Sequence, residues 1–301
     1  MHLSAFGRSV HQLSRAALLV AALFLLPPTG GAQQSDSVRL ELDLASGAGH
    51  RPGADSTAHH GQKTFFVRRD LIASGIAMAA AVGVSAFDLR IAHWARSEGV
   101  QGDSTRYDRV STATRLNETP LTLAALATYG IGRLAHSETT ADVGLHTFEA
   151  LVLTTAISEV LRGTIGRTRP RESQENAFRF DPFNGFVAFE TRSFPSLHTA
   201  AAFATATALV GEIRERRPKA TKVAAPLLYA AAMIPGLTRI YLDQHWASDV
   251  VAGAFVGGLL GSRVVSYAHS HHRNRLDRTL LGISAVPDGY GGTLVMVTLQ
   301  R

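Results

Sequence analysis

Cysteine is absent from this chain of 301 residues, so disulfide bonds, thiolate metal sites and cysteine nucleophiles are excluded. Charged residues are also scarce, at 18% of the chain against about 25% in typical soluble domains. Strand-like alternation is almost missing before residue 281, whereas apolar stretches rich in Ala and Gly are frequent. These absences favour a helical protein, and the chain is long enough to enclose a substantial core.

Acidic residues are outnumbered, because 30 Lys and Arg residues face 24 Asp and Glu residues and the formal net charge is +6. A basic balance favours anionic partners such as phosphate esters, anionic lipid headgroups or nucleic acid. Nucleic acid is not expected as a partner, because the arginines described below cluster as they would around one small anion. A phosphate ester, or contact with a membrane surface, fits better.

The N-terminal residues have the pattern of a secretory signal peptide, predicted at 1–32. Arg8 and Arg15 form a basic start, and the apolar run at 16–26 is too short to span a bilayer comfortably. Small residues at 30–32 offer a cleavage site. We therefore expect an exported protein, in the periplasm or elsewhere outside the cytoplasm, with an uncleaved anchor helix as the alternative.

The rest of the chain divides into three parts. Residues 33–64 are polar, rich in Gly and Ser and without sustained periodicity, which predicts a flexible linker. Residues 65–272 hold the long apolar stretches and are predicted to form the helical domain. Residues 273–301 form a C-terminal extension, in which two β-prone runs flank a glycine-rich turn and predict a short β-hairpin.

Periodicity and end signals predict the helices of the domain. Asp70 is a candidate N-cap, and Thr119 is another, followed by Pro120 at the first helical position. Pro235 is expected to end a helix. The predicted class is all-α, a bundle of about six core helices with a short C-terminal β-hairpin, and the six helices are placed at 71–87, 120–134, 142–162, 198–213, 222–233 and 247–267.

Two short stretches carry residues suited to binding an anion. Arg162 and Arg169 flank the first, and a planar guanidinium donates two parallel hydrogen bonds to a phosphate. Ser196, Leu197 and His198 form the second, where a helix is expected to begin and its N–H groups can bind an anion. Each stretch also has an ordinary explanation. The first could be only a basic flank after an apolar helix, and the second could be only a serine N-cap followed by a surface histidine.

A third stretch holds Arg239, His245 and Asp249. The last two are four residues apart, so on a helix they share a face. A carboxylate at that spacing can select the imidazole tautomer and leave the other ring nitrogen available for attack. The ordinary alternative is a surface pair that contributes little to stability.

The three stretches together resemble the type 2 phosphatidic acid phosphatase and vanadium haloperoxidase superfamily. Six residues separate Arg162 from Arg169, and five separate Arg239 from His245, which precedes Asp249 by four positions. The resemblance covers roughly residues 142–267. It implies a metal-independent phosphatase, either an acid phosphatase or a lipid phosphate phosphatase, that hydrolyses a phosphate monoester or a lipid (di)phosphate.

The resemblance also implies a role for each site residue. His245 would attack phosphorus and form a phosphohistidine, Asp249 would orient His245, and His198 would protonate the leaving alcohol and then activate water. No cofactor is implied, and vanadate is expected to inhibit. The phosphate would be bound by Arg162, Arg169, Ser196, the N–H of Leu197, and Arg239.

This chain departs from the family pattern at three positions. Arg162 stands where lysine is usual, which keeps the charge but changes reach and hydrogen-bonding geometry. Leu197 replaces the usual glycine, so a side chain occupies the wall of the site. Thr238 replaces the usual serine and keeps the hydroxyl. Because His198, Arg239, His245 and Asp249 remain, we expect an active enzyme.

Two other functions stay open. The same pocket can hold vanadate, so a vanadate-dependent haloperoxidase with vanadate as its cofactor is one alternative. The other is a non-catalytic exported protein that binds anionic lipid through its basic face. No metal site is predicted, because the histidines at 269, 271 and 272 fit a basic helix end better than a ligand set.

Membrane topology is ambiguous from the sequence. A soluble or peripheral protein is preferred, because a spanning helix at 142–162 would place His146, Glu149 and Glu159 at membrane depth. Three spans before Arg162, counted from an exported N-terminus, would also leave the site in the cytoplasm. An integral membrane protein is the alternative.

Phenylalanines are concentrated in the loop between the first two stretches. Two interpretations remain open. The rings could form an apolar rim of the site that contacts an acyl or prenyl chain, or they could only pack the loop against the bundle. The residues are Phe178, Phe180, Phe183, Phe186 and Phe189.

Overall fold

The computed structural model describes residues 64–114, 117–271, 283–287 and 293–297. The chain divides into two units, 1–59 and 60–301, and all described residues lie in the second. The predicted signal peptide and all but the last residue of the predicted linker lie outside the described residues.

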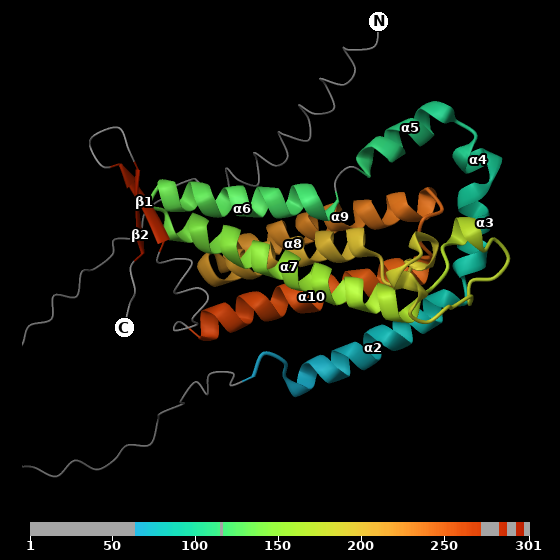
Figure 1. The fold of residues 1–301 in the computed structure, drawn as a ribbon, viewed down its shortest axis with the longest axis horizontal. Helices are drawn as coiled ribbons and strands as arrows, with labels where there is room; N and C mark the ends of the chain where they lie inside the picture. The colour runs from blue at the N-terminus through green and yellow to red at the C-terminus, as the bar shows by residue number, and fades with distance from the viewer. Residues whose placement is uncertain (1–63, 115–116, 272–282, 288–292, 298–301) are drawn as a thin grey trace, which may run out of the picture. The chain divides into compact units, whose positions relative to one another are not determined.

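Helices dominate the part of the chain that the structure describes, so the predicted all-helical class is confirmed (Figure 1). The six longest helices overlap the six that the sequence predicts. They are α2 (Arg68–Ser85), α6 (Glu118–Leu134), α7 (Glu138–Ile165), α8 (Leu197–Arg216), α9 (Pro218–Tyr241) and α10 (Ala247–Ser270).

Shorter elements connect these helices. Three α-helices that the sequence analysis did not predict link α2 to α6, and three single-turn helices lie between α7 and α8. They are α3 (Asp88–Arg96), α4 (Glu98–Gln101), α5 (Ser104–Ala113), η1 (Pro170–Glu172), η2 (Asn184–Phe186) and η3 (Phe189–Thr191).

Two short strands, β1 (Ile283–Pro287) and β2 (Thr293–Val297), pair antiparallel, with Ile283 opposite Val297. The residues that join them lie outside the described residues. The β-hairpin therefore stays a prediction.

Two predicted helix starts are wrong, by three residues and by two residues. The N-cap of α2 is Val67, and Asp70 lies inside the first turn, where its carboxylate accepts a hydrogen bond from the Val67 N–H at 2.8 Å. The N-cap of α6 is Asn117, whose side chain accepts from the Thr119 N–H at 3.0 Å. Several neighbouring polar side chains could satisfy the first N–H groups of each helix, and backbone geometry selects among them.

The predicted end of the fifth helix is also wrong, because α9 continues through Pro226 and Pro235 to Tyr241. A proline removes one backbone hydrogen bond and crowds the preceding turn, which usually ends a helix in isolation. Here α9 packs along α8, and Ala232 joins a buried cluster with Ala202 and Ala206. Tertiary packing therefore keeps the helix continuous and brings Arg239 to its last turn.

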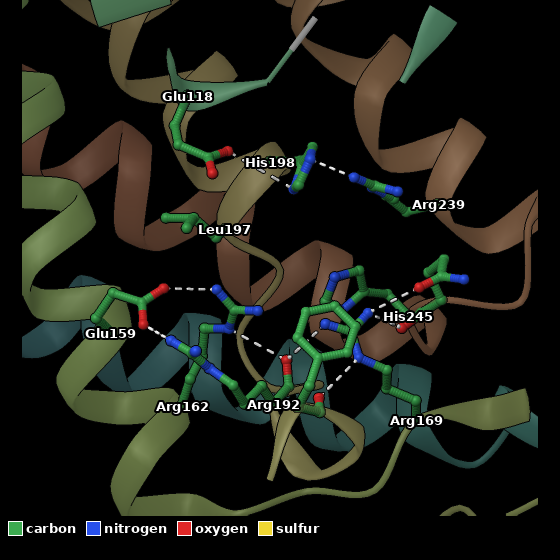
Figure 2. Close-up of a pocket in the computed structure, with 11 residues that line it drawn as sticks. Glu118, Glu159, Arg162, Arg169, Arg192, Leu197, His198, Arg239 and His245 are labelled. Carbon is green, nitrogen blue, oxygen red and sulfur yellow. Dashed lines mark hydrogen bonds and ion pairs between the residues drawn. The ribbon is translucent and has the colours of Figure 1, made fainter. Parts of the chain in front are cut away.

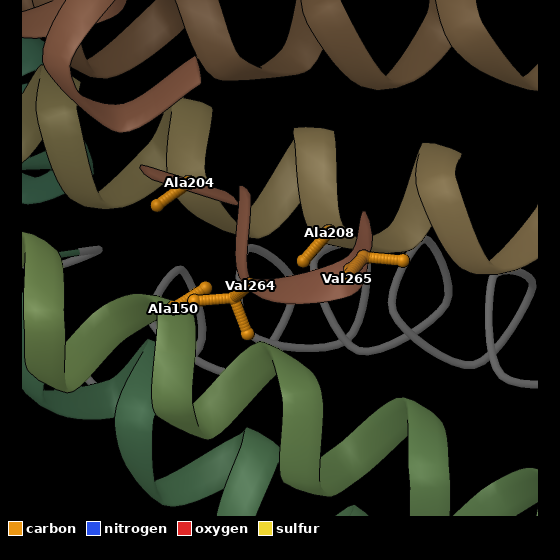
Figure 3. Close-up of a cluster of buried hydrophobic side chains, with 5 residues drawn as sticks. All are labelled: Ala150, Ala204, Ala208, Val264 and Val265. Atoms are coloured by element: carbon orange, nitrogen blue, oxygen red, sulfur yellow. The ribbon is translucent and has the colours of Figure 1, made fainter. Parts of the chain in front are cut away.

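Small residues allow the central helices to approach closely. Ala150 of α7, Ala204 and Ala208 of α8, and Val264 and Val265 of α10 form one buried cluster (Figure 3). Glycine is required where α8 and α10 are nearest, because a Cβ on residue 257 would lie 1.9 Å from the carbonyl oxygen of Ala200. This packing holds the helix ends that carry the site residues in fixed relative positions.

The three sequence stretches meet at one end of the bundle (Figure 1). Because successive helices run in opposite directions, the C-terminal end of α7 lies beside the N-terminal end of α8. The turn between α9 and α10 returns to the same end, and the loop at 166–196 connects α7 to α8 there.

Two described helices, α9 and α10, are long and apolar enough to cross a membrane, and the bent pair α2 and α3 would add a third span if it counts as one. Large apolar side chains are exposed on several outer faces, including Leu71, Ile72, Ile76, Met78 and Val82 of α2 and Val223, Leu227, Ile234 and Leu237 of α9.

The structure weakens one argument for a soluble protein, the cost of His146 and Glu159 of α7 at membrane depth. His146 Nδ1 lies 2.6 Å from Glu212 Oε1 inside the bundle. Glu159 accepts a hydrogen bond from Arg162 at 2.7 Å and lines the pocket described below. Both side chains therefore have a polar partner within the bundle. Paired polar groups inside a bundle are compatible with a membrane protein.

Candidate active site

A cavity of about 230 Å³ opens at the end of the bundle where the three stretches meet (Figure 2). Six of the eight predicted site residues line it, and two, Ser196 and Asp249, do not. The lining residues are Glu118, Glu159, Arg162, Arg169, Phe189, Arg192, Leu197, His198, Arg239, Gln244 and His245.

His245 lies in the turn between α9 and α10 and is almost fully buried. Its Nδ1 is 2.7 Å from the carbonyl oxygen of Ser193. Because a carbonyl only accepts hydrogen bonds, Nδ1 carries the proton and the lone pair of Nε2 is available for attack. Burial lowers the pKa of the imidazole to about 4, against the opposing effect of the Asp249 carboxylate, so the ring is neutral at neutral pH.

Asp249 is fully buried at the start of α10 and reaches His245 by an indirect route. Its Oδ2 is 3.7 Å from His245 Nδ1, which is too long for a hydrogen bond. The same oxygen accepts hydrogen bonds from the Ser193 hydroxyl at 2.5 Å and the Trp246 N–H at 2.9 Å. Asp249 therefore holds Ser193, whose carbonyl in turn holds His245, and the direct hydrogen bond expected from the spacing is not formed.

Arg167 is not among the predicted site residues, although its neighbours Arg162 and Arg169 are. Its guanidinium is buried and donates to Asp249 Oδ1 at 2.6 Å, to Ser248 Oγ at 2.7 Å and to Asp88 Oδ2 at 2.8 Å. It thus compensates two buried carboxylates behind the pocket instead of binding an anion in it. No local signal reveals this role, since Asp88 is 79 residues away in the chain.

Arg162, Arg169 and Arg239 bring three positive charges to one small cavity. Glu159 accepts from Arg162 at 2.7 Å, and Gln244 accepts from Arg169 through its side-chain and main-chain oxygens, both at 3.1 Å. Burial, followed by the repulsion of nearby arginines, lowers the pKa of Arg169. An anion in the cavity would relieve that repulsion, so the arrangement favours a phosphate or a similar oxyanion.

His198 lies in the first turn of α8 and is held between groups of opposite charge (Figure 2). Its Nε2 accepts a hydrogen bond from Arg239, and its Nδ1 lies 3.8 Å from Glu118 Oε2. Glu118 is not a predicted site residue, because it belongs to the N-terminal turn of α6, outside the three stretches. Burial, followed by the charge of Arg239, lowers the pKa of His198 to about 2, so the ring is neutral at neutral pH. A bound anion, together with the carboxylate of Glu118, would favour the protonated ring that proton transfer to a leaving group requires.

Ser196 and Leu197 are placed differently from each other. Ser196 is the N-cap of α8 but is fully buried behind the pocket wall, and its hydroxyl oxygen accepts from Thr199 Oγ1 at 2.9 Å. Leu197 lines the pocket at the N-terminus of α8, where backbone N–H groups favour an anion. The phosphate-binding roles of both residues stay predictions.

Residues 144–273 match the model of the PAP2 superfamily. By this match, the segment at 144–273 is a PAP2 superfamily domain. The matched region contains all eight predicted site residues and Arg167, and every residue that lines the pocket except Glu118.

Three curated relatives are lipid A 1-phosphatases. The protein of Rhizobium etli is 37% identical over 119 residues, which is 38% of this chain and 46% of that protein. The protein of Rhizobium johnstonii is 36% identical over 118 residues, 38% of this chain and 43% of that protein. The protein of Porphyromonas gingivalis is 45% identical over 69 residues, which is 23% of this chain and 15% of that protein. The chain spans less than half the length of each relative.

A solved structure shares the fold, the transmembrane PAP2 type phosphatidylglycerolphosphate phosphatase from Bacillus subtilis. The TM-score is 0.52 with 20% sequence identity, and the alignment covers 69% of this chain and 99% of that one. The likeness extends beyond the family match, because 69% of the chain is more than residues 144–273 contain.

Proposed function

We propose that this protein is a lipid phosphate phosphatase that acts through a phosphohistidine on His245. Nε2 attacks phosphorus, a nitrogen–phosphorus bond forms, and the ester bond to the leaving oxygen breaks. His198, which the negative charge of the bound phosphate brings to its protonated form, gives that oxygen a proton. It then accepts a proton from the water molecule that attacks the phosphohistidine, which releases inorganic phosphate and restores His245.

One observation carries this proposal, the hydrogen bond from His245 Nδ1 to the Ser193 carbonyl. It selects the tautomer whose unprotonated Nε2 belongs to a neutral ring beside the arginine pocket. The positive charge that a phosphoryl transfer needs is supplied by Arg162, Arg169 and Arg239, so the mechanism requires no metal ion.

The substrate that we propose is a phosphate monoester on a lipid of the lipid A type. Support comes from the three relatives, which are named for the removal of such a phosphate. The cavity, at about 230 Å³, is smaller than typical pockets of roughly 300–1,000 Å³ for whole ligands. Only the phosphate and the adjoining atoms of a lipid would therefore enter, and the apolar part would remain outside.

We also propose that α9 and α10 cross a membrane, in place of the soluble protein preferred from the sequence. Their length and composition support this, as do the exposed apolar faces of α2 and α9. The helix ends opposite the pocket carry a basic cluster, which predicts that they face the cytoplasm and that the pocket faces outward. This cluster is Arg214, Arg216, Arg217, Lys219 and Lys222.

One experiment tests both proposals. Carbonate-washed membranes from expressing cells should release inorganic phosphate from lipid A 1-phosphate in excess EDTA, and vanadate should stop the release. Activity that is found only in the wash, or that disappears at once with EDTA, would contradict them. Vanadate-dependent halide oxidation without phosphate release would favour the haloperoxidase.

The phenylalanine loop offers a specific contact for the lipid. Phe186 packs against α7, since a Cβ on Gly163 would lie 2.2 Å from its ring, and Phe180 and Phe189 lie against Arg167 and Arg169. Phe183 is 67% exposed and is the better candidate for contact with an acyl chain.

Replacing Phe183 with serine should lower kcat/KM for the lipid substrate by about 10- to 100-fold, because burial of a phenyl ring against a chain contributes roughly 1.5–3 kcal/mol. Turnover of a small aryl phosphate should be unchanged. Phe186→Ser is the matched comparison, and it should weaken both reactions by loosening the loop. Equal losses on both substrates for Phe183→Ser would refute the lipid contact.

A further inference from the structure

A second polar cluster lies inside the bundle, away from the phosphate pocket. It consists of His146 of α7, Glu212 of α8 and His269 of α10. His146 Nδ1 and His269 Nε2 lie 2.6 Å and 3.1 Å from the same oxygen, Glu212 Oε1. The two histidines and the carboxylate thus converge from three helices on a single point.

The spacing suits one divalent transition-metal ion. Nitrogen and oxygen ligands lie about 2.0–2.2 Å from zinc, so neighbouring ligand atoms around a tetrahedral ion are roughly 3.3–3.6 Å apart. The three ligand atoms already lie within 4.8 Å of one another, so small side-chain movements would let all three bind one ion. Water would supply the fourth ligand of a tetrahedral zinc site. Two imidazoles and one carboxylate suit zinc and other first-row divalent metals, and do not suit magnesium or calcium.

Neighbouring charges orient this set. Glu212 is fully buried, and its other oxygen, Oε2, accepts a hydrogen bond from Arg216. Arg216 also donates to Asp142 Oδ2 at 2.7 Å. The positive charge of Arg216 is therefore shared between the carboxylates of Glu212 and Asp142. Oε1 is thereby turned toward the two histidines. His269 is partly exposed, which gives an ion a route into the cluster.

We propose that His146, Glu212 and His269 bind one zinc ion that ties α7, α8 and α10 together. The ion would have a structural role, because Glu212 is 14 positions along α8 from His198, about 21 Å at 1.5 Å per residue. The proposal is independent of the phosphatase mechanism. The competing arrangement is a metal-free network in which both imidazoles donate to Glu212.

The test uses the full-length protein purified in detergent, stripped with a chelator and then titrated with Zn²⁺ alone. We expect one zinc per chain by elemental analysis after gel filtration, together with a rise in unfolding temperature. Co²⁺ in place of Zn²⁺ should give visible absorption bands of a site with nitrogen ligands. Absence of stoichiometric zinc in the wild-type protein, or of any thermal shift, would establish the metal-free network.

Variants assign the ligands. His269→Gln removes a ligand from a partly exposed position and should weaken zinc binding at least 100-fold while the chain still folds. His146→Gln tests the buried ligand. His93→Gln is the matched control, since His93 is exposed on α3 outside the cluster, and it should keep full zinc content. Unchanged zinc binding in His269→Gln would overturn the assignment.

Discussion

His245→Asn should abolish phosphate release, with a loss of roughly 10⁴-fold or more in kcat, as expected when a covalent nucleophile is removed. Asparagine is chosen because its amide nitrogen can occupy the position of Nδ1 and donate to the Ser193 carbonyl, whereas nothing replaces Nε2. The local hydrogen bond, which is 2.7 Å long in the structure, can then survive while the attacking atom is lost.

Rapid quenching in alkali should trap a labelled protein from a phosphate-labelled substrate, because phosphohistidine is stable in base and labile in acid. The label should be missing from His245→Asn. His136→Asn is the control, since His136 is exposed and has a φ of 52°, a conformation that asparagine tolerates. Label that persists in His245→Asn, or a kcat within 10-fold of wild type, would refute the phosphohistidine.

Arg167→Met should destabilise the fold by about 3–5 kcal/mol, because removal of one partner leaves buried charge uncompensated. Asp88 and Asp249 are both almost fully buried, and Arg167 donates to each of them. The change should also lower activity, since Asp249 holds the serine that positions His245. Thermal unfolding in detergent measures the first effect and phosphate release the second.

Arg169→Met, two residues further on, provides the contrast. Arg169 lines the pocket, so its loss should lower kcat/KM by about 10²–10³-fold and change stability little. Asp88→Asn combined with Arg167→Met should recover part of the lost stability, because it removes one uncompensated charge. If the two arginine variants unfold at the same temperature, the assignment of a structural role to Arg167 is wrong.

The sequence by itself determined the helical class and most of the pocket. Apolar stretches bounded by polar or turn-forming residues specify helices through local hydrogen bonding and periodicity. His245 does lie near Asp249, although it belongs to the turn before α10. Arg162 and Arg169 flank the end of α7 as the pattern predicts, whereas Arg239 lies in a part of α9 that was not predicted to be helical. The departures were local, as in α9, where packing against α8 carries the helix past Pro235.

Only the tertiary structure decided how distant residues combine. The imidazole tautomer depends on the Ser193 carbonyl, 52 residues from His245, and the charge of Asp249 is compensated by Arg167, 82 residues away. The cluster of His146, Glu212 and His269 joins three helices, so spacing in the chain carries no sign of it. The physical reason is the same in each case. A buried polar group must find a partner, and which partner it finds depends on which helix faces pack together, a property of the whole bundle.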